Sequence, residues 1–395
     1  MIDQLPFRSR ERQRPVPSAF NRSLTLAAPK RGPVRVSFMI DDLGRAGTET
    51  QLLALLRTLD RNSVEPDLIL LNGEGELSRS LEPTGIPILR LGVTKLFGRS
   101  GLRAAQKLRR HWRAFQPDVA QIYFLDSAYL GVPVAKWAGV PKVVRVRNNL
   151  SYWLTRKHRF LNRLIRSRVD VTLTNSEAGR DAILDRDGVS SERVAVIENG
   201  VDLERFPNWR LAPRSGTIRI GTVANLRPVK NIDGLMRAAR MLIKRFPQLH
   251  FEVAGEGEQR AELERLHSEL QLGSRFVLRG SVSDIPAFLA SLDIAVLPSH
   301  SEGMSNALLE FMAAGRATVA TDVGANAKLL NHGECGLLVP AGDDMAFGSA
   351  IKKLIGDESL CRDLGRAARE RVEAKFSRNS MQVKFEQFYW KLAAS

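Results

Sequence analysis

Cysteines, metal-ligand motifs and long apolar runs are scarce in this 395-residue chain, and each scarcity excludes a class of protein. Cys335 and Cys361 are far apart and belong to no partner motif, which argues against a disulfide framework and indicates a reducing compartment. No run of 18 apolar residues is present, so a membrane-spanning helix is not expected. The six histidines show no metal-ligand spacing, so no zinc site is predicted.

Acidic residues are also fewer than basic ones. The chain has 43 Asp or Glu and 59 Lys or Arg, which gives a net charge of +16. The excess is concentrated at residues 99–168, where 16 basic residues and two aspartates give a local net charge of +14. This region is a solvated basic face, a surface for anionic lipid headgroups or a surface for nucleic acid. The motifs below favour lipid, and no nucleic-acid partner is expected.

The length of the chain allows two domains of ordinary size. Residues 1–32 are rich in Arg, Pro and Ser and lack the apolar core of a secretory signal, so they are predicted to be a disordered basic arm. Short apolar runs alternate with helical patterns over residues 33–208 and again over 217–375, which predicts two α/β domains. Residues 209–216 have the composition of a linker, and residues 376–395 are predicted to end the chain as a helix.

The most informative stretch is residues 293–321, which reads as a strand, a loop, a helix and a second strand. Glu302 and Glu310 bracket the start of that helix, where unpaired amides and the positive end of the helix dipole suit a phosphate. Ser305 is placed to cap the helix, and Gly303 allows close backbone approach. Glu310, roughly 7 Å further along the axis, is spaced to hold a ribose beside a diphosphate. The alternative is a pair of ordinary surface glutamates.

This stretch, SEGMSNALLEFMAAGRATVAT, resembles the E-x7-E signature of the retaining glycosyltransferases of family 4. Glu302 and Glu310 match the two acids, whereas Phe311 stands where alanine is usual and Ala317 stands where proline is usual. The resemblance implies an α/β chain of the GT-B class, with two facing Rossmann-like domains. It also implies that the C-terminal helix crosses back onto the first domain. The first domain would bind the acceptor, and the second domain would bind the donor.

Two further loops are similar to family motifs and supply more candidate residues. The loop after the first predicted strand resembles the G-G-x-E motif, with Gly47 and Glu49 retained, which implies that the Gly47 amide faces the sugar phosphate. The loop at residues 224–231 matches G-R-L-x-x-x-K-G at Lys230, a point charge suited to a leaving diphosphate. Asn225 replaces the motif's arginine, and Arg227 is the candidate to reach the same phosphates.

The resemblance therefore implies a glycosyltransferase that uses a UDP- or GDP-sugar without a metal or other cofactor. Glu302 and Lys230 are the predicted catalytic residues, with Glu302 positioning the sugar hydroxyls. The predicted donor-binding residues are Gly47, Asn225, Arg227, Lys230, Gly303, Met304, Ser305, Asn306 and Glu310. The predicted acceptor contacts at the carboxyl edge of the first sheet are Arg145, Arg147 and Asn148.

The expected acceptor is a glycan or lipid-linked saccharide of bacterial polysaccharide or lipopolysaccharide synthesis, which places the protein in the cytoplasm, peripheral on the inner membrane face. The basic and aromatic segment at residues 151–168 is either an interfacial helix or a core helix with a solvated outer face. Two alternative functions stay open, namely a GT-B nucleotide-sugar epimerase and a polyanion-binding relative that has lost catalysis.

Overall fold

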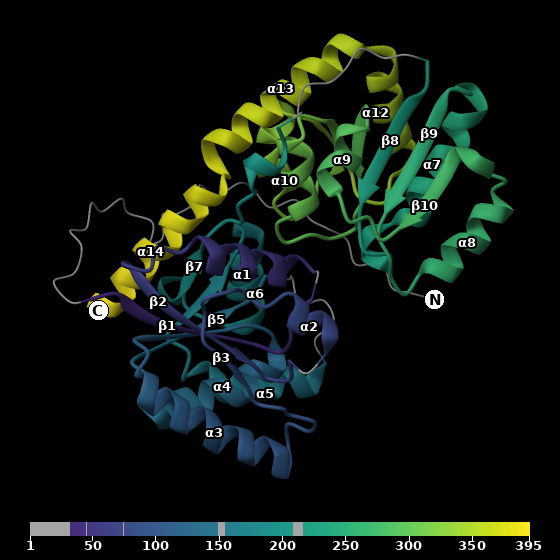
Figure 1. The fold of residues 1–395 in the computed structure, drawn as a ribbon. Helices are drawn as coiled ribbons and strands as arrows, with labels where there is room; N and C mark the ends of the chain where they lie inside the picture. The colour runs from purple at the N-terminus through teal and green to yellow at the C-terminus, as the bar shows by residue number, and fades with distance from the viewer. Residues whose placement is uncertain (1–31, 45, 74, 149–154, 208–215) are drawn as a thin grey trace.

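The computed structural model describes residues 32–395 apart from 45, 74, 149–154 and 208–215 (Figure 1). The predicted arm at residues 1–32 and the predicted linker at 209–216 lie almost entirely outside the described residues, as does the start of the segment at 151–168. Two parallel sheets form two α/β domains, so the predicted fold class is confirmed at this level. Among the described residues, every helix is too short or too polar to traverse a bilayer.

The first domain contains a seven-stranded parallel sheet in the order β3-β2-β1-β4-β5-β6-β7. Its strands are β1 (Val34–Ile40), β2 (Val64–Leu70), β3 (Ile88–Arg90), β4 (Val119–Ile122), β5 (Lys142–Val146), β6 (Val171–Thr174) and β7 (Val194–Val196). Its helices are α1 (Gly47–Thr58), α2 (Glu76–Ser80), α3 (Arg99–Phe115), α4 (Leu125–Ala138), α5 (Arg156–Arg166) and α6 (Glu177–Asp187).

Strand β1 is apolar along its second half because helices cover both faces of this sheet. Phe38 and Ile40 pack into one core with leucines of α1, whereas Met39 packs into another with Trp112 of α3. Helices α3, α4 and α5 lie together on the face of the sheet that carries Met39, at the bottom of the first domain in Figure 1. The basic residues concentrated at 99–168 are therefore carried largely by one layer of helices.

The second domain contains a six-stranded parallel sheet in the order β10-β9-β8-β11-β12-β13. Its strands are β8 (Ile218–Val223), β9 (Leu249–Ala254), β10 (Phe276–Gly280), β11 (Ile294–Leu297), β12 (Ala317–Thr321) and β13 (Leu337–Val339). The later helices are α7 (Ile232–Arg245), α8 (Arg260–Glu269), α9 (Ile285–Ala290), α10 (Asn306–Ala313), α11 (Asn326–Leu329), α12 (Asp344–Gly356), α13 (Glu358–Lys375) and α14 (Arg378–Ala394).

Strand order reverses direction between β1 and β4 in the first sheet and between β8 and β11 in the second. Such switch points leave a crevice at the carboxyl ends of the strands, because the loops on either side depart in opposite directions. The segments that follow β1, β8 and β11 carry Gly47, Lys230 and Glu302, so the topology brings the three sequence motifs to two such crevices.

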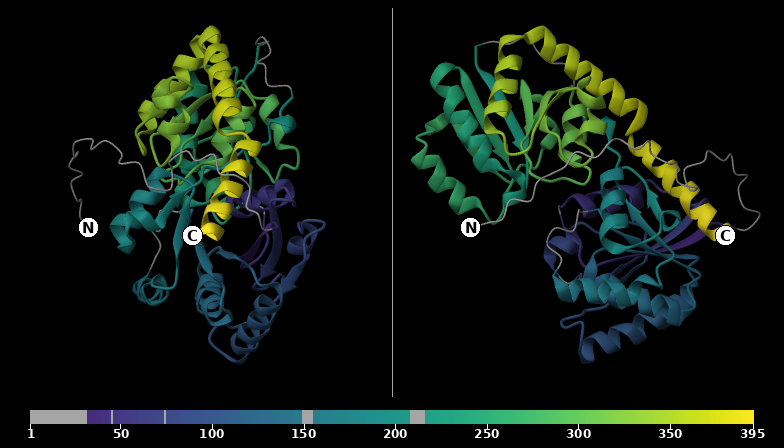
Figure 2. Two further views of the ribbon diagram at one scale, coloured as in Figure 1. Left: turned by 90° about the vertical axis from the view of Figure 1, so that its left-hand side faces the viewer. Right: turned by 180° about the vertical axis from the view of Figure 1, so that it is seen from behind.

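Helix α14 crosses back from the second domain and packs on α1 and β1 of the first (Figures 1 and 2). Phe385 and Tyr389 join the core around Phe38, with the Phe38 and Tyr389 rings in edge contact at 6.0 Å. The buried Tyr389 hydroxyl donates to Gln121 Oε1 of β4 at 3.0 Å. The chain therefore connects the domains twice, once forward after β7 and once back through α14.

We expect Tyr389→Ala to lower the free energy of unfolding by about 3–5 kcal/mol, because it removes a fully buried aromatic ring. Tyr389→Phe keeps the ring but leaves Gln121 Oε1 without its donor, so a loss of about 1–3 kcal/mol is expected. Urea denaturation measures both values. Val383→Ala, at a half-exposed position of the same helix, is the control and should change stability little. Equal stability of all three variants would contradict the role of α14 in the core.

Candidate active site

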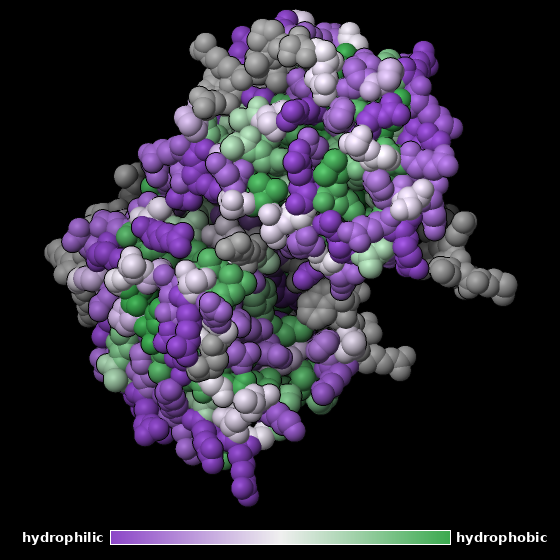
Figure 3. Space-filling view, turned by 45° about the vertical axis from the view of Figure 1, so that its right-hand side comes forward, coloured by the Kyte–Doolittle hydropathy of each residue, from purple (hydrophilic) through white to green (hydrophobic). Residues whose placement is uncertain are grey.

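A cavity of about 880 Å³ lies between the two domains at the carboxyl ends of both sheets. The space-filling view shows the surface hollowed between the two lobes (Figure 3). Glu302 lines this cavity, as does every residue predicted to bind the donor, namely Gly47, Asn225, Arg227, Lys230, Gly303, Met304, Ser305, Asn306 and Glu310. Most of these residues belong to the second domain, and Gly47 reaches the cavity from the first.

Two helices begin at this cavity, one from each domain. Helix α1 begins at Gly47 and α10 begins at Asn306, and both residues line the cavity. The Asn306 Nδ2 atom donates to the Gly47 carbonyl oxygen at 3.0 Å, so the two helix ends lie close together. Ser305 caps α10 by accepting from Leu308 N at 3.3 Å. The positive ends of two helix dipoles therefore meet at one place, which favours an anion between them.

Lys230 and Glu302, the two predicted catalytic residues, form an ion pair on the wall of the cavity. Lys230 ends the short 3-10 turn η4 (Pro228–Lys230), and its Nζ lies 2.6 Å from Glu302 Oε1. Ser299 Oγ donates to the same Glu302 oxygen at 2.7 Å, and the Glu302 side chain is only 9% exposed. Lysine has three N–H donors, so this pair leaves donors on Lys230 for a phosphate.

Glu310 lies on α10, behind the residues that line the start of the helix, and its side chain is 20% exposed. Burial raises the pKa of its carboxyl to about 7, and the Arg205 guanidinium, 3.8 Å away, only partly opposes this shift. A carboxylate accepts hydrogen bonds from two hydroxyl groups, as a ribose 2′,3′-diol requires. Such bonds would stabilise the ionised form, so a bound ribose is expected to lower this pKa.

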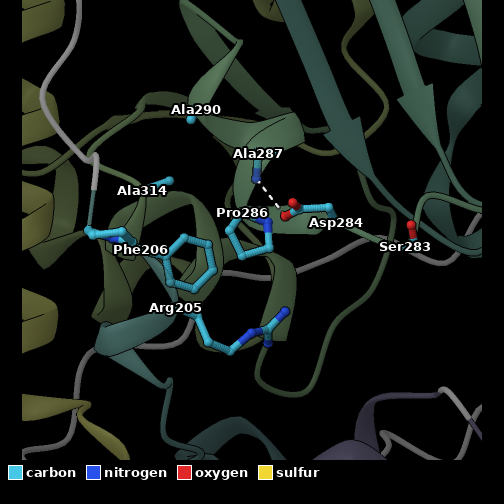
Figure 4. Close-up of a pocket in the computed structure, with 9 residues that line it drawn as sticks. Arg205, Phe206, Ser283, Asp284, Pro286, Ala287, Ala290 and Ala314 are labelled. Carbon is cyan, nitrogen blue, oxygen red and sulfur yellow. Dashed lines mark hydrogen bonds between the residues drawn. The ribbon is translucent and has the colours of Figure 1, made fainter.

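Arg205 also forms part of the wall of a second cavity, of about 490 Å³, beside the first (Figure 4). Phe206, Pro286 and Ala287 lie around it, and Asp284 Oδ1 caps α9 by accepting from Ala287 N at 2.9 Å. Ser283 and Arg205 line both cavities, so they stand where the larger one ends.

One acidic residue of the first domain, the half-buried Glu49, also lines the larger cavity. Burial raises the pKa of Glu49, which lines the cavity near the start of α1, and the positive charge of Arg227 partly opposes that shift. Arg227 lines the same cavity as Asn225, the residue that replaces the arginine of the family motif.

The predicted acceptor residues separate in the structure, and two of the three require correction. Asn148 lines the cavity, but Arg145 and Arg147 do not. Arg145 is 6% exposed and donates to Asn162 Oδ1 of α5 at 2.8 Å, and the buried Arg147 pairs with Asp187 of α6. Both arginines therefore turn toward these helices and not into the cavity. Burial lowers the pKa of each to about 10.

Several residues that shape the site were not predicted from the sequence. Gln51 and Asn199 bond to Asn306, Ser299 bonds to Glu302, and Arg205 lies beside Glu310. Asn199 begins the short segment Asn-Gly-Val-Asp at residues 199–202, which resembles a further family motif and was a usable signal, whereas Gln51 and Arg205 carried none. Among the described residues, no three metal-ligating side chains come together.

Comparisons with known proteins agree with this architecture. Residues 45–205 match the family described as Glycosyltransferase Family 4, and residues 208–371 match Glycosyl transferases group 1. The chain therefore belongs to the family 4 glycosyltransferases of the GT-B fold, and it is a glycosyltransferase enzyme.

Three similar proteins illustrate this placement. The chain is 27% identical to a glycogen synthase of Mycobacterium tuberculosis over 310 residues, which cover 75% of this chain and 74% of the relative. It is 23% identical over 342 residues, 78% and 88% of the two chains, to UDP-Gal:alpha-D-GlcNAc-diphosphoundecaprenol alpha-1,3-galactosyltransferase of Escherichia coli. The crystal structure of Anabaena Alr3699/HepE in complex with UDP matches this chain with a TM-score of 0.78 and 19% sequence identity. The match covers 90% of this chain and 99% of that chain. The last comparison concerns the fold alone.

We expect Glu310→Gln to raise stability at high pH. The folded pKa of Glu310 lies above its ordinary value of 4.5, so the folded chain binds more protons between pH 4.5 and about 7. The free energy of unfolding therefore falls as pH rises through this range, by on the order of 3 kcal/mol. Denaturation at pH 8 should show the variant to be more stable than the parent, with the difference shrinking toward pH 4.5. An exposed control, Glu370→Gln, should show no such pH dependence, and a parallel response of both variants would contradict the assignment.

Proposed function

We propose that this glycosyltransferase moves a sugar from a nucleoside diphosphate sugar, with UDP as the preferred nucleotide, to a glycan or lipid-linked saccharide. One observation carries the proposal, namely that two helix N-termini and Lys230 line the same interdomain cavity. This arrangement supplies positive charge and N–H donors where a diphosphate would lie. The Anabaena relative in complex with UDP and the E. coli relative named for UDP-Gal support the choice of nucleotide.

The chemistry we propose is transfer with retention of anomeric configuration. The amides of α1 and α10 and the Lys230 ammonium neutralise the charge that develops on the leaving diphosphate. Glu302 accepts from hydroxyls of the transferred sugar while its other bonds, to Lys230 and Ser299, keep its orientation. Glu310 holds the ribose. Because protein groups supply this charge, we propose that the reaction needs no metal ion.

Lys230→Ala is expected to slow hydrolysis or transfer of UDP-glucose by about 100- to 1000-fold, the usual effect of removing one preorganised donor to a developing charge. Loss of UDP-induced thermal stabilisation should accompany it. Arg219→Ala is the matched control, because this exposed residue of the same domain lies outside the cavity. NMR of the released sugar reports its anomeric configuration. An inverted product would refute retention, and isomerised nucleotide sugar without transfer would favour an epimerase.

We also propose that the helix layer of the first domain binds an anionic membrane surface, where the enzyme reaches its acceptor. Helix α3 exposes Arg103, Lys107 and Arg110, and exposed apolar side chains accompany this charge. Phe97 is 70% exposed just before α3, and Phe160 is 63% exposed on α5. Basic and aromatic side chains on one surface suit binding to anionic headgroups. The E. coli relative, named for a diphosphoundecaprenol-linked acceptor, supports a lipid-linked substrate.

Charge reversal on α3 tests this surface. Arg103→Glu with Lys107→Glu should weaken binding to phosphatidylglycerol vesicles by about tenfold or more, because each basic residue near such a surface contributes on the order of 1 kcal/mol. Vesicle sedimentation at low and high salt measures the effect. Lys352→Glu with Lys353→Glu reverses two exposed charges on α12 of the second domain and is the control. Equal loss in both pairs would show that total charge, rather than this surface, determines binding.

A further inference from the structure

A single side chain of the second domain makes three hydrogen bonds to the first domain. Asn306 Oδ1 accepts from Gln51 Nε2 at 3.0 Å and from Asn199 Nδ2 at 2.8 Å. Asn306 Nδ2 donates to the Gly47 carbonyl oxygen at 3.0 Å. Gln51 lies on α1, and Asn199 lies in the turn after β7. We call Gly47, Gln51, Asn199 and Asn306 the interdomain cluster.

The interdomain cluster is continuous with the place where the chain crosses between the domains. Gln51 Nε2 also donates to the Gly200 carbonyl oxygen at 3.1 Å, and Gly200 N donates to Gln51 Oε1 at 3.3 Å. The next residue, Val201, donates from its N to Phe376 O and accepts from Arg378 N, both at 2.9 Å. Phe376 and Arg378 stand where the chain returns to the first domain as α14. The cluster therefore connects the start of α10 to both crossings.

Packing around the cluster leaves little room for change. A Cβ atom at Gly47 would lie 3.0 Å from Asn306 Nδ2, and one at Gly303 would lie 2.3 Å from the Asn148 carbonyl oxygen. Both glycines line the cavity, and each faces the opposite domain. The distance between the first turns of α1 and α10 is thus determined by direct contact and by the hydrogen bonds of Asn306.

We propose that Asn306 is a positioning residue that holds α1 against α10, so that amides from both domains act on one donor molecule. Two positive helix ends repel each other, and the Asn306 bonds offset that repulsion until an anion lies between them. Its partners are polar groups that water can replace, so the contact is reversible. The proposal rests on the proposed function, because it assumes that a nucleoside diphosphate sugar binds in this cavity.

Asn306→Ala and Gln51→Ala test the proposal, with UDP and UDP-glucose as ligands and Gln106→Ala, at an exposed position of α3, as the control. The variants should bind UDP with a dissociation constant within about tenfold of the parent, because Lys230 and Glu310 remain. At saturating UDP-glucose, hydrolysis should slow by about tenfold or more, because the donor meets fewer ordered amides. Small-angle scattering of UDP-saturated protein should show a larger radius of gyration in both variants, a readout that a local loss of stability would not move.

Each outcome decides for or against the proposal. The double variant should be no slower than the slower single variant, since both residues act through the same contact. A parent-like hydrolysis rate and radius in Asn306→Ala would overturn the proposal, as would a rate lost only in proportion to UDP affinity. If Asn306→Ala fails to fold, Gln51→Ala carries the same test from the first domain. A parent chain that does not bind UDP would instead refute the proposed function.

Discussion

The meeting of two helix N-termini across the interdomain cavity is the arrangement on which the rest of the site depends. Helix α1 comes from the first domain and α10 from the second, and their first residues are hydrogen bonded. Like dipole ends repel, so this geometry stores unfavourable electrostatic energy that an anion would relieve. The same contact that brings the domains together therefore lies where we propose that the diphosphate of the donor binds.

Two acidic groups, of which Glu310 lines the cavity, have pKa values that burial raises. Burial raises the pKa of Glu310 to about 7 and that of Asp41, at the end of β1, to about 6. Two hydrogen bonds from Ser127 oppose the shift at Asp41 without cancelling it. Buried carboxyl groups lower stability when ionised, and proteins accept this cost mainly where a ligand uses the charge. The Glu302 carboxylate is bonded to Lys230 and Ser299.

The two domains contribute unequally to the site and to its surroundings. The second domain supplies Lys230, Glu302 and Glu310, which fits its strong likeness to the family motifs. The first domain supplies Gly47 and Asn148, together with a basic helix layer on one face of its sheet. In this family the fold is shared widely, so the specific chemistry must be read from such side chains rather than from the architecture.

The sequence alone determined the two α/β domains, because short apolar runs alternating with helical patterns admit few other architectures. It also selected Glu302, Glu310 and Lys230 as candidates, since each lies in a short segment whose neighbours match a motif, and all three line one cavity. Arg145 and Arg147 were misplaced because the direction of a side chain depends on strand register and on helices distant in sequence. Only the tertiary structure paired Lys230 with Glu302, 72 residues apart, and Asn306 with Gln51, 255 residues apart. The first contact joins two loops at the edge of one sheet and the second joins two domains, and no local pattern in either segment records them.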